Sequence, residues 1–124
     1  MGIVNATPDS FLDGGQHYSP PDPGPTVDYA LKLVSEGADI LDIGGETAQA
    51  TSPVLSPEEE ARRVIPVIER LAKQVSVPIS VDTYKYQVAA KALDVGASIV
   101  NDTSGLTDPK LGELAARHRA ALVV

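Results

Sequence analysis

The chain has 124 residues, enough for one domain or part of one. Ten basic against seventeen acidic residues leave a net charge of −7, which argues against a general nucleic-acid or anionic-membrane surface, because phosphate groups require clustered Lys and Arg. Cysteine is absent, which excludes disulfides and thiolate chemistry, and no apolar run approaches the ~20 residues that span a bilayer. We therefore expect no nucleic-acid partner, no membrane partner and a cytoplasmic location.

Short apolar segments that end in polar residues recur along the chain. They lie at Ile3-Val4, Ile40–Ile43, Ile79–Val81 and Ile99–Val100, with a last one at Ala121–Val124. The first four stop at or close to Asn5, Asp42, Asp82 and the Asn101-Asp102 pair. Short, nearly all-apolar strands separated by helical stretches predict a parallel sheet with helical crossovers. Because parallel strands point the same way, we expect their polar ends to gather on one face, where α/β proteins bind ligands.

Four helices are predicted between these strands. They run from near Thr26 to Gly37, from Ser56 to about Ala72, from Lys85 to Val95, and from Asp108 onward. Four prolines between Pro20 and Pro25 argue against regular structure before the first helix. Gly37 and Gly96 stand where a helix is expected to stop.

The second helix has the clearest start signal. Ser56 suits the capping position, Pro57 the first helical position, and Glu59 completes a capping box. We interpret Glu58, Glu59 and Glu60 as structural residues whose charges suit a helix N-terminus. Pro66 falls inside the apolar stripe and is expected to kink the helix rather than end it.

A local repeat favours a barrel. Residues 37–42 and 96–101 have the same order of predicted features, namely a glycine, a tight turn, a buried strand and a polar residue at the strand end. Repetition of one βα unit suits a barrel better than an open two-sided sheet, whose topology reverses midway. The connections at 8–25 and 44–53 are longer than a strand-to-helix link requires, and both follow strands. We expect them to be binding loops on the face that carries the polar tips.

Four segments, IVNATPDSFLDGG, GADILDIGGET, PISVDTYK and NDTSG, occur in this order and together closely resemble dihydropteroate synthases over the whole chain. The resemblance implies a TIM (β/α)8 barrel, with residues 1–124 forming its N-terminal half, from the first strand to about the fifth, with parallel strands and helices outside. It also implies a transferase of folate biosynthesis. That enzyme condenses 6-hydroxymethyl-7,8-dihydropterin diphosphate with p-aminobenzoate, giving dihydropteroate and diphosphate.

The same resemblance assigns site residues. Asn5 matches an asparagine that helps to hold Mg²⁺ and the diphosphate, whereas Asp82 and Asn101 match residues that bind the pterin. Asp9, Ser10 and Phe11 match a mobile loop that helps to form the p-aminobenzoate pocket. These residue types suit the chemistry, because a carboxylate and an amide match the N–H donors of a pterin edge. Mg²⁺ with oxygen ligands neutralises the diphosphate as the C–O bond breaks.

The second loop departs from the family pattern G-G-E-S-T-R-P-G. Here Thr47-Ala48-Gln49 follows Gly44-Gly45-Glu46, so that Ala48 stands at the hydroxyl position and Gln49 at the arginine position. Thr47 can partly replace the hydroxyl near the diphosphate. Loss of one charge-assisted hydrogen bond costs on the order of 1.5–3 kcal/mol, which is roughly ten- to over a hundred-fold in rate if the bond strengthens in the transition state.

Length is the second departure. A complete barrel needs eight strands and about 250 residues, and 124 residues reach only the fifth strand. We expect the chain by itself not to catalyse the reaction and its outer strands to form open edges, covered by a C-terminal half or by a second copy in a homodimer.

Other interpretations stay open at this point. Read without the resemblance, Asp82 could cap the following helix, Asn5 could stabilise a turn, and Asn101-Asp102 could form an Asx turn. Asp42 we interpret as structural. Two other functions remain alternatives: another pterin-binding enzyme, such as a methyltransferase, and a non-catalytic half-barrel that serves as a binding or assembly module.

Overall fold

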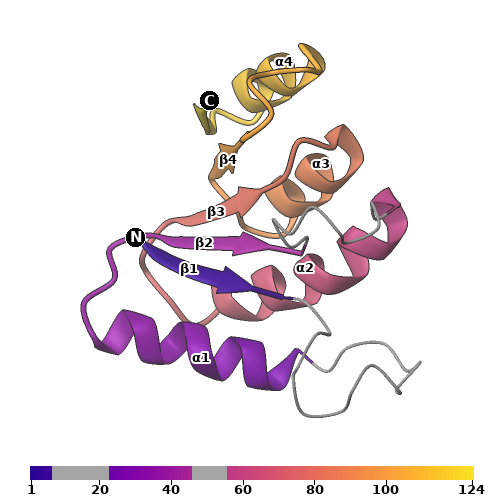
Figure 1. The fold of residues 1–124 in the computed structure, drawn as a ribbon. Coiled ribbons are helices and arrows are strands. Elements are labelled where there is room, and N and C mark those ends of the chain that lie inside the picture. The colour runs from indigo at the N-terminus through magenta and orange to yellow at the C-terminus, as the bar shows by residue number, and fades with distance from the viewer. Residues whose placement is uncertain (7–22, 46–55) are drawn as a thin grey trace.

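A computed structural model of the chain describes residues 1–6, 23–45 and 56–124. In these ranges five strands alternate with four helices (Figure 1). The strands are β1 (Gly2–Asn5), β2 (Leu41–Gly44), β3 (Ile79–Asp82), β4 (Ile99–Asn101) and β5 (Ala121–Val123). The helices are α1 (Gly24–Ser35), α2 (Pro57–Ala72), α3 (Tyr86–Asp94) and α4 (Lys110–Arg117).

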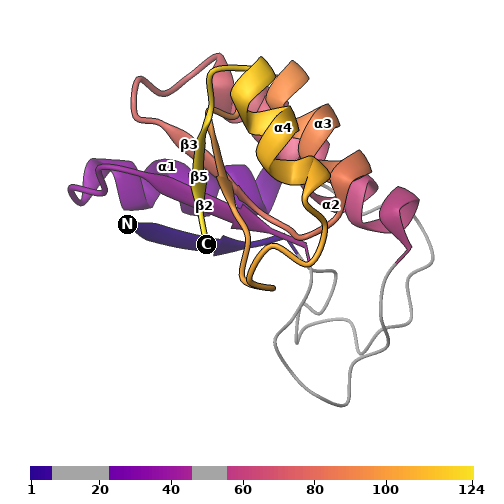
Figure 2. The same ribbon diagram turned by 90° about the horizontal axis from the view of Figure 1, so that it is seen from above.

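The strands form one sheet in the order β1-β2-β3-β4-β5, and every neighbouring pair is parallel. Each strand therefore lies beside the one before it, and the order never reverses as it does in an open two-sided sheet. The helices cover one face of the sheet and contact one another in chain order (Figures 1 and 2). The prediction of an α/β fold with parallel strands and helices outside, as in part of a (β/α)8 barrel, is confirmed.

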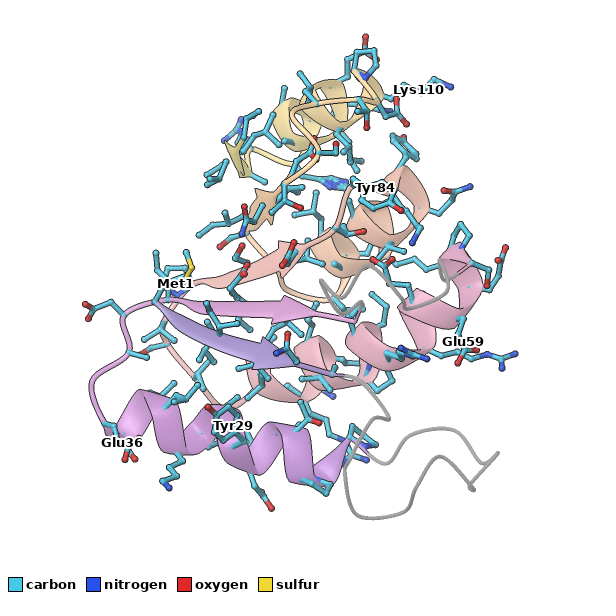
Figure 3. The ribbon with its side chains drawn as sticks, viewed as in Figure 1. Met1, Tyr29, Glu36, Glu59, Tyr84 and Lys110 are labelled. Atoms are coloured by element: carbon cyan, nitrogen blue, oxygen red, sulfur yellow. The ribbon has the colours of Figure 1, made fainter. Side chains whose placement is uncertain are left out.

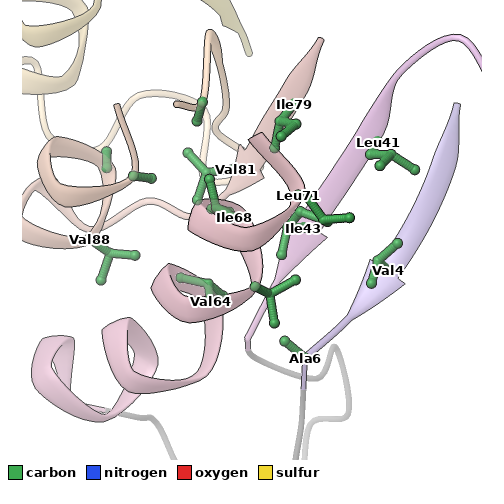
Figure 4. Packing of buried hydrophobic residues seen from close by; sticks show 14 of the residues in the cluster. Val4, Ala6, Leu41, Ile43, Val64, Ile68, Leu71, Ile79, Val81 and Val88 are labelled. Atoms are coloured by element: carbon green, nitrogen blue, oxygen red, sulfur yellow. The ribbon is translucent and has the colours of Figure 1, made fainter. Parts of the chain in front are cut away.

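The hydrophobic core lies between the sheet and the helices (Figure 4). Strand side chains alternate between the two faces, and those on the helix side are buried apolar residues, among them Val4, Ile43, Val81 and Val100. They pack against buried residues of the helices, including Val27 and Ala30 of α1, Val64, Ile68 and Leu71 of α2, Val88 of α3, and Leu111 and Leu114 of α4. We call the opposite side of the sheet the inner face. It carries the alternate residues Ile3, Asn5, Asp42, Gly44, Ser80, Asp82, Ile99, Asn101, Ala121 and Val123.

The first helix differs from its predicted bounds at the start. It begins at Gly24, so that Pro25 lies within its first turn, where a missing N–H breaks no intrahelical hydrogen bond. The expectation that prolines as far as Pro25 exclude regular structure was therefore wrong for the last of them. The helix stop is as predicted, since Gly37 follows α1 with a φ of +105°.

The other helices follow the sequence signals closely. Ser56 caps α2, and its Oγ accepts a hydrogen bond of 3.1 Å from the backbone N–H of Glu59. The helix continues through Pro66 to Ala72, as predicted. Helix α3 stops just before Gly96, which has a φ of +128°. None of the helices in residues 23–45 and 56–124 is long and apolar enough to cross a membrane.

Candidate functional site

The polar ends of the strands form one row on the inner face. The register pairs Asn5 with Gly44, Gly44 with Asp82, and Asp82 with Asn101. All four residues therefore occupy equivalent positions at the carboxyl ends of their strands, on the same face. Because neighbouring strands lie about 4.8 Å apart, Asp82 and Asn101 are direct neighbours and Asn5 lies about 10 Å from Asp82. We call these four residues the rim row.

Gly44 leaves room for the Asp82 side chain. A Cβ atom placed on Gly44 would lie 3.3 Å from the Cβ and 3.4 Å from Oδ2 of Asp82. The Asp82 carboxylate therefore leans over the Gly44 backbone, in the gap between β1 and β3, and stays partly exposed. A side chain at position 44 would press on Asp82 and force its carboxylate to shift.

Asn101 points across the sheet rather than into a turn. Its Nδ2 donates a hydrogen bond of 3.3 Å to Oδ2 of Asp42, which lies on β2, two strands away. The Asx turn is made instead by Asp102, whose Oδ1 accepts from the backbone N–H of Ser104 at 2.9 Å and whose Oδ2 accepts from that of Leu106 at 3.0 Å. Asn101 and Asp102 therefore make different contacts, and only Asn101 belongs to the rim row.

Asn5 is the outermost member of the rim row. It is the last residue of β1 and its side chain is exposed. Its amide oxygen is a hard oxygen ligand of the type that suits Mg²⁺, which keeps several waters and binds through one or two protein oxygens together with phosphates. In residues 1–6, 23–45 and 56–124 no group of three or more His, Cys, Asp or Glu side chains is placed to hold a metal ion.

A buried charge network next to the rim row was missed by the sequence analysis. Glu60 of α2 is 1% exposed, and its Oε1 lies 2.6 Å from Nζ of Lys85. Its Oε2 accepts a hydrogen bond of 2.5 Å from Oγ1 of Thr83. Thr83 and Lys85 belong to the segment that directly follows Asp82, so that Glu60 anchors this segment to α2.

A signal for the burial of Glu60 is present in the sequence. Residues 60, 64 and 68 stand four apart, which places Glu60 on the same helical stripe as the core residues Val64 and Ile68. Glu59, the neighbour of Glu60 and the acidic residue of the capping box, lies on the outer side of α2 (Figure 3) and pairs with Arg62 at 3.8 Å. Charge at a helix start explains Glu58 and Glu59 well, but it does not account for the buried contacts of Glu60.

The same helix holds the end of β2. Arg63 donates a hydrogen bond of 3.0 Å from Nη1 to the carbonyl oxygen of Gly45. A Cβ atom on Gly45 would lie 3.0 Å from Cγ1 of Val64 and 3.4 Å from Cγ of Glu60, so that a larger residue here would require these side chains to shift. Helix α2 thus fixes the chain just beyond two neighbouring strands of the rim row.

The predicted loop residues lie outside the described residues. These are Asp9, Ser10 and Phe11 of the first loop, and Thr47, Ala48 and Gln49 of the second. The described chain enters the first loop after the buried Ala6 and the second after Gly45. Both points immediately follow members of the rim row, on β1 and β2 respectively.

A separate cavity of about 470 Å³ lies between α3 and α4. It is lined by Tyr86, Gln87, Asp108, Lys110, Glu113 and Arg117. Arg117 donates a hydrogen bond of 3.1 Å to the Tyr86 hydroxyl across it. None of the predicted site residues within the described ranges lines this cavity, and the rim row is the arrangement that brings Asn5, Asp82 and Asn101 together.

Comparison with known proteins identifies the family of the chain. The family model for pterin binding enzymes matches residues 1–124. The chain is 48% identical to the dihydropteroate synthase of Bacillus subtilis over 129 aligned positions, covering 100% of the chain and 43% of that protein. The dihydropteroate synthase of Xanthomonas albilineans, solved with 4-aminobenzoic acid, superimposes with a TM-score of 0.88 at 47% identity, covering 100% of the chain and 44% of that structure.

A second structure of the Xanthomonas albilineans enzyme, in complex with 7,8-dihydropteroate, matches 98% of the chain with a TM-score of 0.77 at 47% identity, and 43% of that structure is covered. The chain belongs to the pterin binding enzyme family. The relatives it matches over their N-terminal part are dihydropteroate synthases, and the chain spans less than half of their length.

Proposed function

We propose that this chain is the N-terminal half of the barrel of a dihydropteroate synthase. The protein transfers the pterinylmethyl group of 6-hydroxymethyl-7,8-dihydropterin diphosphate to p-aminobenzoate and releases diphosphate. The observation that carries the proposal is the rim row, which places Asn5, Asp82 and Asn101 together at the carboxyl ends of neighbouring parallel strands. In parallel α/β barrels this is the end at which ligands bind.

In this proposal Asp82 and Asn101 bind the pterin ring. An ionised carboxylate accepts hydrogen bonds only, and an amide oxygen also accepts. Adjacent acceptors on β3 and β4 suit a planar ligand edge with neighbouring N–H donors, such as the amino-substituted edge of a pterin. The segment that directly follows Asp82 is anchored to α2 through Thr83 and Lys85, so the backbone at Asp82 is fixed before the ligand arrives, which lowers the entropic cost of binding.

Asn5 is the residue that would hold Mg²⁺ with the diphosphate. Bound there, the cation supplies charge neutralisation at the leaving group as the C–O bond breaks. Asn5 is exposed at the outer end of the rim row, about 10 Å from Asp82 by strand spacing. That separation suits a substrate whose ring and phosphates are recognised at different points of one rim.

The exposed inner face supports the proposal of a missing half. Ile3 is 62% exposed and Val123 is 46% exposed, although both lie on strands of the sheet. In a closed barrel such inward side chains are buried by those of the other strands. The strands β1 and β5 are the outer strands of the described sheet, where further strands add. The alternative is a homodimer in which a second copy of the chain covers this face. Light scattering together with proteolysis of the full-length protein distinguishes the homodimer from a barrel completed by the missing half.

The test is direct binding of 6-hydroxymethyl-7,8-dihydropterin diphosphate to the full-length protein by calorimetry, with MgCl₂ present. We expect Asp82→Ala to weaken binding by about ten- to a hundred-fold, the worth of one charge-assisted hydrogen bond. Asp94→Ala, an exposed aspartate at the end of α3, is the matched control and should bind like the unaltered protein. Equal affinity of the two variants would contradict the proposal.

An activity assay separates the proposed function from the alternatives. Formation of dihydropteroate from the two substrates supports the synthase. Methyl transfer that requires a corrinoid cofactor would point instead to a pterin-binding methyltransferase, and pterin binding without turnover would favour a binding or assembly module. The cytoplasmic location stays a prediction, which cell fractionation can test.

A further inference from the structure

A buried carboxylate beneath the rim row has no assigned role. Asp42 lies on β2, two residues before Gly44, on the inner face. It is 4% exposed, and among the described residues its hydrogen-bond partner is Asn101, through Oδ2. The other oxygen, Oδ1, is buried and accepts no hydrogen bond from the described part of the chain. Among residues 1–6, 23–45 and 56–124 no cation forms a salt bridge with Asp42, and a buried carboxylate held only by one amide is costly.

The contact with Asp42 fixes the polarity of the Asn101 amide. An asparagine side chain can present either its oxygen or its NH₂ group to a neighbour, because a half-turn of the amide exchanges the two. A carboxylate can only accept, so the NH₂ group of Asn101 must face Asp42 Oδ2, from which it lies 3.3 Å. The amide oxygen is then directed elsewhere and is the end left for a ligand.

We propose that Asp42 is a positioning residue that sets what Asn101 recognises. By holding the amide nitrogen, it makes the oxygen of Asn101 the atom presented in the rim row, beside the carboxylate of Asp82. The site then selects a ligand edge with N–H donors opposite both residues and disfavours an analogue that places an acceptor there. The inference rests on the proposed function for the identity of the ligand, a pterin, but the amide orientation itself does not depend on it.

The isosteric variant Asp42→Asn tests this inference. An asparagine at position 42 has its own NH₂ group, which can donate to the oxygen of Asn101 and turn the amide over. We expect the dissociation constant of 6-hydroxymethyl-7,8-dihydropterin diphosphate to rise about tenfold or more in the full-length protein. Asp39→Asn is the matched control, since it makes the same chemical change at an exposed residue before β2. It should leave binding unchanged.

A double-mutant cycle separates positioning from direct contact. If Asp42 acts through Asn101, Asp42→Asn should add less than about threefold in the background of Asn101→Ala, because the group it orients is gone. An equal effect in both backgrounds would overturn the inference, as it would mean that Asp42 meets the ligand itself. The inference would also be overturned if Asp42→Asn bound pterin diphosphate with the same affinity as the control Asp39→Asn. If the unaltered protein bound no pterin diphosphate, the proposed function would be wrong, whatever the role of Asp42.

A measurement without ligand keeps the inference testable in every case. The chain has two asparagines, Asn5 and Asn101, and the first is exposed. In nitrogen-15 NMR spectra of the unaltered protein, we expect the side-chain NH₂ hydrogens of Asn101 to exchange with solvent more slowly than those of Asn5. Asp42→Asn should shift the Asn101 side-chain signals, and Asp39→Asn should not. Equal exchange of the two side chains, or no shift, would overturn the inference.

Discussion

The buried pair of Glu60 and Lys85 gives a prediction whose size follows from the structure. The side chains are 2% and 10% exposed, and the charged atoms lie 2.6 Å apart. In Lys85→Met the aliphatic stem is largely kept, so the main change is loss of the ammonium group and the Glu60 carboxylate stays buried. Removing one partner of a buried ion pair costs about 3–5 kcal/mol. The remaining hydrogen bond from Thr83 to Glu60 favours the lower end.

We therefore expect Lys85→Met to lower the free energy of unfolding of the full-length protein by about 3 kcal/mol, out of the ~5–15 kcal/mol typical of a domain. The assay is urea denaturation followed by circular dichroism, analysed for a constant slope with denaturant. The matched control is Lys91→Met, an exposed lysine on α3, whose replacement should change stability by less than about 0.5 kcal/mol.

A double variant tests the cause. Glu60→Gln combined with Lys85→Met removes both charges and keeps an acceptor for the Thr83 hydroxyl. It should recover more than half of the lost stability, because no uncompensated charge stays buried. A loss for Lys85→Met within the ~0–1 kcal/mol of a solvent-exposed pair would refute this reasoning. The reasoning would also be refuted if the double variant lost more stability than the two single variants together.

Four further predictions concern glycines and the second loop. Gly96→Ala should destabilise by about 1–3 kcal/mol, because Gly96 has a φ of +128° and its added Cβ would lie 2.5 Å from that of Ala72. Gly112→Ala should instead stabilise by about 0.5–1 kcal/mol in the same denaturation assay, since Gly112 lies within α4 and the nearest atom to its added Cβ is 4.0 Å away. Gly44→Ala should weaken pterin diphosphate binding about tenfold with little loss of stability, because the added Cβ displaces the Asp82 carboxylate; unchanged binding in calorimetry would contradict this. Gln49→Arg restores the family residue and should raise kcat/KM about ten- to a hundred-fold in a dihydropteroate assay, and a neutral or harmful effect would show that position 49 no longer faces the diphosphate.

Much of the fold follows from local patterns in the sequence. The apolar runs, the Ser56 cap and the glycines at 37 and 96 each act within a few residues, so hydrophobic periodicity and capping rules are enough to place the elements. The start of α1 was placed too late because a proline in a first helical turn resembles a loop residue when read along the chain.

The rim row was also predictable, for a geometric reason. Strand residues alternate in direction and parallel strands share one polarity, so residues that end successive strands must meet at one edge. This rule is enough to predict that Asn5, Asp82 and Asn101 lie at the same edge of the sheet. Their roles in binding stay predictions that the experiments above test.

Tertiary structure decided the contacts that support this row. The hydrogen bond between Asn101 and Asp42 joins residues 59 apart in the chain, and the ion pair of Lys85 with Glu60 joins residues 25 apart. Their partners depend on which side chains meet when α2 packs on the sheet and when β4 lies two strands from β2. The sequence by itself determined the strands, the helices and the edge at which the polar residues collect. Only packing decided how those residues are oriented, because orientation depends on neighbours that no local pattern encodes.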